Sequence, residues 1–130
     1  MTIALQSQIP TLRATLRRRA SRLVRDVRDR IVATAKISMT GPKSGRGYRR
    51  GNRTHQASAP GEAPAVDTGL LINSIQTAEE GDLRAVLGVG AEYGIWLEFG
   101  TRRMAPRPFL GPAFEQAKPI FEAGIRELLK

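Results

Sequence analysis

A single apolar stripe near the start of the chain limits most strongly what the sequence can fold into. Within residues 11–38, apolar side chains recur at steps of four or seven, as they do on one face of an α-helix. These side chains are Leu12, Leu16, Leu23, Val27, Ile31 and Ala35. The spacing predicts one long amphipathic helix. Pro10 stands just before it, where a proline starts a helix without losing a hydrogen bond.

Arginines fall largely outside this stripe, on the polar surface of the predicted helix. They are Arg13, Arg17, Arg18, Arg25 and Arg28. Arg22 and Asp26 are four residues apart, as are Arg25 and Asp29, so both pairs are expected to form ion pairs along the helix. Two interpretations stay open: the arginines form a solvated face, or they contact an anionic surface.

Residues 41–66 are expected to form a basic mobile loop. Thr40-Gly41-Pro42 ends the helix, because glycine and proline terminate helices readily. Five basic residues and three glycines then lie between Lys43 and Arg53. No apolar period follows them, and the segment is too polar to be buried.

Residues 67–130 are predicted to fold into short helices and strands. Asp67 or Thr68 is expected to cap a short helix that runs to Ile75. Strands over residues 74–79 and 83–89 flank a Glu-Gly-Asp turn and predict an antiparallel hairpin.

The C-terminal third is predicted to hold two helices. Residues 93–99 suit a short helix packed on the sheet and ended by Gly100, and residues 101–105 are a candidate further strand. The last helix is expected to begin at Pro112 and to kink or restart at Pro119. Its apolar side consists of Phe114, Phe121, Ile125 and Leu128. The chain length fits a single domain over residues 1–130, divided into 1–40, 41–66 and 67–130.

Charge is distributed unevenly between the two halves. Residues 1–60 hold 14 Lys and Arg against two Asp, a net charge of +12. Residues 61–130 hold seven against ten, a net charge of −3. This balance predicts anionic partners, either nucleic acid or an acidic face of another copy of the chain.

Catalytic patterns are missing from the sequence. The chain has no cysteine, and its one histidine, His55, excludes a histidine pair. Gly88-Val89-Gly90 lacks the third glycine and the long following helix of a dinucleotide site. No apolar run approaches the roughly 20 residues of a membrane helix. We therefore expect no enzyme activity, no catalytic residue, no cofactor, no metal and no membrane contact.

Three stretches of the second half match one ordered set of motifs. They are residues 63–75 (APAVDTGLLINSI), 93–101 (YGIWLEFGT) and 107–113 (RPFLGPA). In order and spacing they resemble the neck, or tail-completion, morphogenesis proteins of long-tailed bacteriophages and prophages. Leu70 and Ile72 depart from that family, which often has basic or polar residues there.

The resemblance implies an α+β fold with a long N-terminal helix, a small antiparallel sheet with a β-hairpin, a short central helix and a C-terminal helix. It implies a virion structural protein, made in the bacterial host cytoplasm, that forms a ring at the head–tail junction around the DNA channel. The partners implied are other copies of the chain and the neighbouring connector, head-closure and tail proteins. Non-specific contact with DNA in the channel is expected as well.

The motif residues are the expected framework of the joint between subunits. They are Glu98, Phe99, Gly100, Arg107, Pro108 and Phe109, with Leu70 and Ile72 of the preceding short helix. The competing interpretation makes Phe99 and Phe109 core anchors, while the glycine and the prolines only shape the chain.

Two other functions stay open. A sequence-tolerant nucleic-acid-binding module would use the arginine-rich helix and loop, through Arg17, Arg18, Arg25, Arg46, Tyr48, Arg49, Arg50 and Arg53. A chaperone-like or scaffolding factor would be absent from the finished particle.

Overall fold

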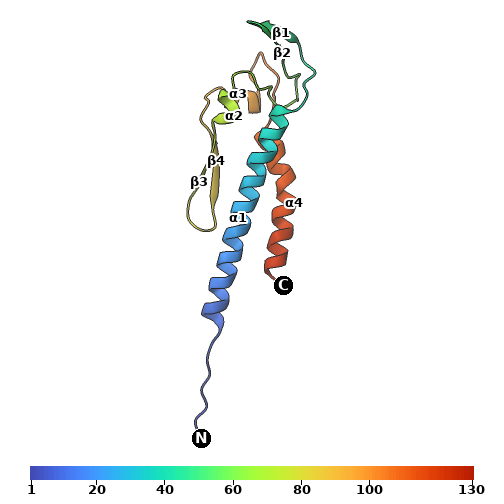
Figure 1. Ribbon diagram of the computed structural model, residues 1–130. Helices are drawn as coiled ribbons and strands as arrows, with labels where there is room; N and C mark the ends of the chain where they lie inside the picture. The colour runs from blue at the N-terminus through green and yellow to red at the C-terminus, as the bar shows by residue number, and fades with distance from the viewer.

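The computed structural model describes all 130 residues and shows an α+β fold of four helices and two β-hairpins (Figure 1). The helices are α1 (Ile9–Thr40), α2 (Leu70–Asn73), α3 (Gly94–Phe99) and α4 (Leu110–Leu128). The strands are β1 (Gly47–Arg50), β2 (Arg53–Gln56), β3 (Ile75–Glu79) and β4 (Ala85–Val89). The predicted fold class and the long first helix are confirmed. None of the helices combines the length and the apolar content needed to cross a membrane.

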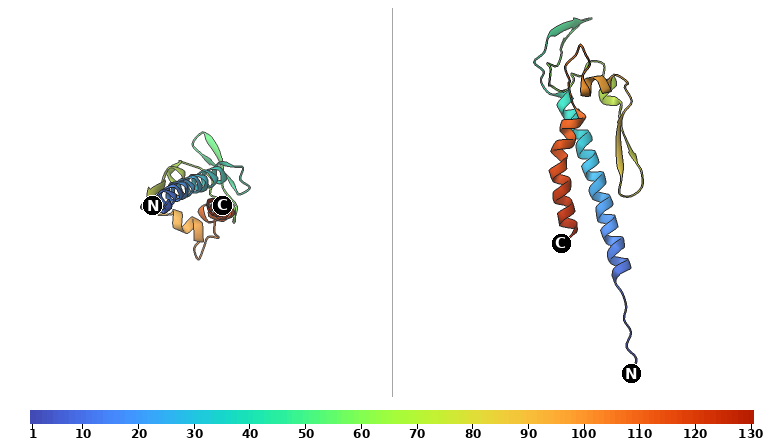
Figure 2. Two further views of the ribbon diagram at one scale, coloured as in Figure 1. Left: turned by 90° about the horizontal axis from the view of Figure 1, so that it is seen from below. Right: turned by 180° about the vertical axis from the view of Figure 1, so that it is seen from behind.

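Helices α1 and α4 form an antiparallel pair that makes up the long axis of the molecule (Figures 1 and 2). The β3–β4 hairpin lies along α1, and the β1–β2 hairpin projects beyond the C-terminal end of α1. The first turns of α1 extend past the end of α4 toward the N-terminus. Leu12 is 59% exposed there, so the predicted stripe is buried only from Val27 onward.

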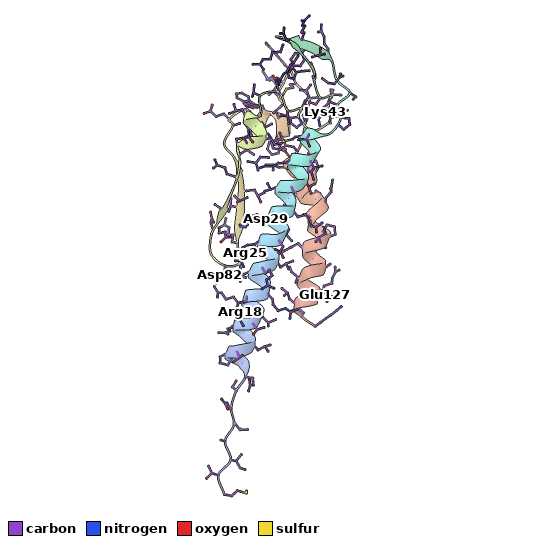
Figure 3. All side chains as sticks on the ribbon, viewed as in Figure 1. Arg18, Arg25, Asp29, Lys43, Asp82 and Glu127 are labelled. Carbon is purple, nitrogen blue, oxygen red and sulfur yellow. The ribbon has the colours of Figure 1, made fainter.

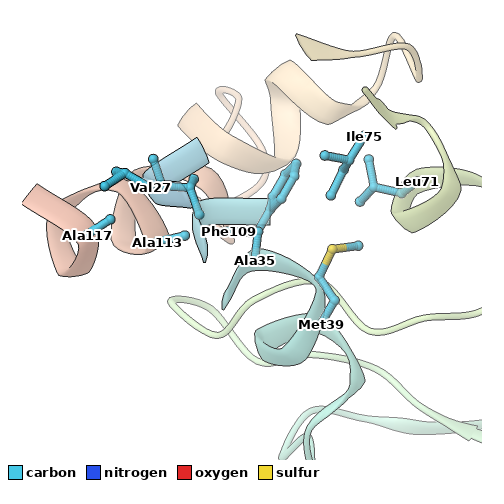
Figure 4. Packing of buried hydrophobic residues seen from close by; sticks show 9 residues of the cluster. Val27, Ala35, Met39, Leu71, Ile75, Phe109, Ala113 and Ala117 are labelled. Carbon is cyan, nitrogen blue, oxygen red and sulfur yellow. The ribbon is translucent and has the colours of Figure 1, made fainter. Parts of the chain in front are cut away.

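The core lies where α1 ends and α4 begins (Figure 4). The buried apolar residues of α1 recur every four positions, which places them on one face of the helix. α4 contributes two alanines, and small side chains let the two helices approach closely. The buried apolar cluster consists of Val27, Ile31, Ala35, Met39, Leu71, Ile75, Phe109, Ala113 and Ala117.

Each hairpin is a separate two-stranded antiparallel sheet. In one, Tyr48 pairs with His55, and in the other, Ile75 pairs with Val89. The single small sheet predicted from the sequence is therefore two hairpins. Residues 101–105 are not a strand, because the Thr101 N–H donates to the Met104 carbonyl oxygen at 2.8 Å and closes a turn there.

The expectation that residues 41–66 form only a loop, too polar to be buried, was wrong. The segment contains the β1–β2 hairpin, and Gly51 at φ 62° takes the first central position of its two-residue turn. The segment is also partly buried, since Ser58 is only 7% exposed and Ala63 packs against the core.

The predicted apolar side of α4 is right only in part, because Phe121 packs against the core whereas Phe114 does not. The helix begins at Leu110 and continues through Pro119 without a restart. Its buried residues are Ala113 and Ala117, whereas Phe114 is 55% exposed. The fully buried positions of α4 are therefore alanines that face α1, and of the larger side chains Leu110 and Phe121 pack against the core while Phe114 borders the surface.

Candidate assembly surface and basic hairpin

Glu98, at the end of α3, holds the first turn of α4. Its Oε2 accepts hydrogen bonds from the backbone N–H groups of Phe109 at 2.9 Å and Leu110 at 3.1 Å. Its Oε1 accepts from the N–H of Gly111 at 2.7 Å. The first N–H groups of a helix have no partner within the helix, and a carboxylate there also opposes the positive end of the helix dipole. Glu98 therefore joins the two helices within one chain.

Three of the other motif residues have structural roles within the chain. The Arg107 N–H donates to the Leu97 carbonyl oxygen at 2.6 Å, and its Nε donates to that of Ser58 at 3.2 Å. Gly100 ends α3 with φ 76°, a conformation that L side chains rarely adopt. Phe109 is 1% exposed and belongs to the core.

Most of the motif residues therefore stabilise the fold of the chain itself. For Phe109 this agrees with the interpretation that it is a core anchor. Phe99 is the exception, at 76% exposed, so the interpretation of Phe99 as a core anchor was wrong. Pro108 is half-buried in the loop before α4. Leu70 is 60% exposed, whereas Ile72 packs against the core. The motif residues still available to a partner are chiefly Phe99 and Leu70.

α3 exposes most of its apolar surface. Ile95 is 61% exposed and Trp96 is 56% exposed. Of the residues expected to pack this helix on the sheet, Tyr93 and Leu97 do pack against the core, whereas Trp96 and Phe99 face outward. Gly94 is its buried residue, and a side chain added there would lie 2.8 Å from Val89 Cγ1. The helix therefore approaches β4 through its glycine and turns most of its large side chains outward.

Two apolar grooves run along β4 and meet at Leu87 and Phe114. The first, of about 270 Å³, lies between α1, β4 and α4, with Ile31 in its wall. The second, which we name the β4 groove, has a volume of about 570 Å³ and lies between β4, α3 and α4. It is lined by Leu87, Val89, Ile95, Phe99 and Phe114, among others. Sequence reasoning missed both, because they are formed by elements far apart in the chain.

The β1–β2 hairpin carries a dense basic surface. Tyr48 stacks on His55 with 5.7 Å between ring centroids. The one aromatic side chain among the predicted nucleic-acid contacts is therefore already packed against a histidine of the same hairpin. Arg50 pairs with Asp67. Three exposed arginines, Arg46, Arg49 and Arg53, have no acidic group within 4.0 Å.

Some arginines of α1 bond to other side chains of the same chain, and others have no acidic partner (Figure 3 labels Arg18 and Arg25). Arg17 pairs with Asp82 at the tip of the β3–β4 hairpin at 2.8 Å, and Arg25 donates to Ser21. Arg18 is exposed without an acidic partner. The ion pairs expected between Arg22 and Asp26 and between Arg25 and Asp29 are not formed. Instead, Arg28 binds both Asp29 and Glu79, and so ties β3 to α1.

The base of the basic hairpin is held by Glu62. Its carboxylate accepts hydrogen bonds from the Ser44 hydroxyl, from the Ser44 N–H at 3.1 Å and from the Ala59 N–H at 2.8 Å. These bonds, led by that of the Ser44 hydroxyl, lower the pKa of Glu62 to about 2 from its usual 4.5. Nearby Lys43 adds to the effect, while its own Nζ donates to the Ser38 carbonyl oxygen near the end of α1.

We expect the Glu62 carboxyl to titrate near pH 2 in the folded protein. Because the folded pKa is below the unfolded value, this contact stabilises the fold above about pH 4.5 and is lost as the pH falls toward 2. Carboxyl carbon chemical shifts recorded by NMR against pH measure the midpoint. Ser44→Ala is expected to move it back toward 4.5, and a wild-type midpoint already at 4.5 would contradict the prediction.

No group of three or more His, Asp or Glu side chains is placed to hold a metal ion. Comparison of the chain with protein-family models, curated proteins and solved structures gave no match.

Proposed function

We propose that this chain is a structural subunit of a tailed-phage virion, which assembles as a ring at the head–tail junction around the DNA channel. The motif resemblance supports the family, and the surface of the isolated subunit supports the assembly. In this role the chain binds copies of itself and adjoining connector and tail proteins, and it catalyses no reaction.

The accessible surface area carries the proposal. A compact monomer of 14.2 kDa exposes about 6,800 Å². This chain exposes 9774 Å², and only 13 of its 130 residues are buried. The excess of about 3,000 Å² is within the range that permanent subunit interfaces bury. Seventeen large apolar side chains are exposed at the same time. A subunit with this surface is suited to neighbours that cover it.

The separation of charge supports a ring more than a two-fold dimer. In a ring, one face of each subunit meets a different face of the next, so the two faces can carry opposite charges. Basic groups gather on the first half of α1 and on the β1–β2 hairpin, whereas Glu92 and Glu115, which form no ion pair within the chain, line the β4 groove. Such complementary charges would set the orientation of adjacent subunits.

Native mass spectrometry and negative-stain electron microscopy of the full chain test the proposal. We expect a single closed oligomer whose images show a ring with a central channel. Antibody labelling of the phage particle is then expected to mark the head–tail junction. A monomer at every concentration that also binds no connector or tail protein would overturn the assembly, and label elsewhere on the particle would overturn the location.

A second function, sequence-tolerant binding of nucleic acid, is favoured by the three unpaired arginines of the β1–β2 hairpin. Neutralising phosphates releases counterions, so affinity falls with salt in proportion to the number of contacts. We expect the Arg46→Gln, Arg49→Gln and Arg53→Gln triple variant to make the negative slope of log affinity against log salt shallower by up to about three for duplex DNA. Fluorescence anisotropy measures the slope.

Arg84→Gln is the control variant for this prediction, because Arg84 lies outside the basic hairpin and pairs with Glu80 at 2.8 Å. It is expected to leave the slope unchanged. Wild-type protein that shows no salt-dependent binding at low ionic strength would exclude this second function.

A further inference from the structure

The first eight residues form an unpartnered segment with the pattern of a β-strand. They have no helix or strand structure, and they run away from the body of the molecule (Figures 1 and 2). Met1, Ile3 and Leu5 alternate with Thr2, Ala4 and Gln6, so an extended chain would place the three large apolar side chains on one face. Ile3 is 77% exposed and Leu5 is 98% exposed, so this face is bare in the isolated subunit.

β4 offers a free edge beside the β4 groove. The Gly90 N–H donates to the Ser74 carbonyl oxygen, and the Glu80 N–H donates to that of Arg84. In this register Gly88 and Val86 also bond to β3, so the N–H and C=O groups of Leu87 and Val89 point away from it. No other strand pairs with β4. An added strand would satisfy these groups while its side chains entered the groove.

Charge distinguishes the two grooves. The first groove contains Arg28, Arg84 and Lys118 among its lining residues. The β4 groove has only glutamates as charged residues, namely Glu92, Glu98 and Glu115. The N-terminal segment is followed by arginines, with no acidic residue before Asp26. The β4 groove is therefore the one that attracts this end of the chain.

Ile3 and Leu5 of the same copy cannot reach the β4 groove. The two grooves meet at Leu87 and Phe114, and Ile31 lies in the wall of the first groove with these two residues. Helix α1 rises about 31 Å from Pro10 to Ile31. Leu5 is five residues from Pro10, and an extended chain of that length spans only about 18 Å. The occupant of the groove therefore has to come from another copy.

We propose that residues 1–8 of one copy lie in the β4 groove of a neighbouring copy as a strand added to the free edge of β4. Ile3 and Leu5 pack against Phe99 and Phe114 of the neighbour, and Glu92 and Glu115 face the arginines that begin α1 of the first copy. The contact is heterologous and repeats from one subunit to the next. It rests on the self-association put forward under Proposed function.

Disulfide cross-linking tests the contact directly, because the chain has no cysteine of its own. Chains with Leu5→Cys are mixed with chains with Phe99→Cys and oxidised with copper phenanthroline. We expect heterodimers from this pair. Gln6→Cys mixed with Phe99→Cys is the matched control, because Gln6 lies on the opposite face of the strand, and it is expected to give almost none. Equal cross-linking by both pairs would overturn the proposal.

Deletion of residues 1–8 separates this inference from the proposed function. Within the isolated subunit the segment is hydrogen-bonded only to the first turn of α1, where the Ile9 N–H donates to Ser7 Oγ at 3.3 Å and the Leu12 N–H donates to the Gln8 carbonyl oxygen at 3.0 Å. This turn is exposed and far from the core, so the thermal unfolding of the monomer is expected to change little. The concentration needed for half-assembly is expected to rise about a hundredfold or more.

The variants Leu5→Asp and Gln6→Asp give the same comparison without a deletion. Leu5→Asp is expected to behave like the deletion, and Gln6→Asp like the wild type. A wild-type chain that forms rings which the deletion leaves intact would overturn this inference and leave the proposed function standing. A wild-type chain that never self-associates would overturn both.

Discussion

Replacing Phe109 with alanine is expected to lower the free energy of unfolding by about 3–5 kcal/mol. The ring is 1% exposed and lies among residues of α1, α2 and β3, so its removal leaves a cavity that these elements cannot easily close (Figure 4). For a domain of this size, the loss corresponds to a fall in melting temperature of about 10–20 °C. Urea unfolding followed by circular dichroism, at concentrations below self-association, measures the change.

Phe99→Ala is the matched control, since the same atoms are removed from a side chain that is 76% exposed. Its free energy of unfolding is expected to change by less than about 0.5 kcal/mol in the monomer. The same variant is expected to weaken assembly, because Phe99 lines the β4 groove. Equal destabilisation of the monomer by the two variants would contradict the placement of Phe109 in the core and Phe99 at the surface.

Glu98→Ala is expected to lower the free energy of unfolding by about 2–3 kcal/mol. The substitution leaves three backbone N–H groups at the start of α4 without an acceptor, and two of them belong to half-buried residues, Leu110 and Gly111. Hydrogen exchange followed by NMR is expected to show faster exchange at Phe109, Leu110 and Gly111 than elsewhere in α4.

Glu115→Ala is the control for this prediction, because Glu115 lies on α4 with its side chain exposed and in no ion pair. It is expected to change the stability by less than about 0.5 kcal/mol. Glu98→Gln keeps one acceptor oxygen and is expected to fall between the two. A Glu98→Ala variant as stable as the wild type would show that the cap contributes little to the fold.

The sequence predicts the elements with regular local patterns. The four-residue steps of Val27, Ile31 and Ala35 require a helix whatever the rest of the chain does, and the β3–β4 hairpin follows from its turn and its strand pattern. The β1–β2 hairpin was missed because its strands are polar on both faces, although Gly51-Asn52 between short polar runs is a turn signal.

The roles of the motif residues could not be predicted from order and spacing. Whether Phe99 or Phe109 is buried depends on the turn between them, and the contact between Glu98 and the start of α4 depends on the same turn. Both phenylalanines belong to apolar stretches, and the pattern of these stretches does not show which side chains face the core. The motif therefore locates the junction between α3 and α4, and the three-dimensional contacts decide which of its residues face a partner.

The part of α1 that extends past the end of α4 would bind a partner with little loss of conformational entropy. A short helix alone in water rarely forms, because its first turn fixes many dihedral angles for a single hydrogen bond. In α1 that initiation is already provided by the turns packed in the core, and residues 9–22 continue from them as the same helix. This part of the helix is thus ordered before any contact is made. A partner that binds it would therefore lose little affinity to the ordering of the backbone.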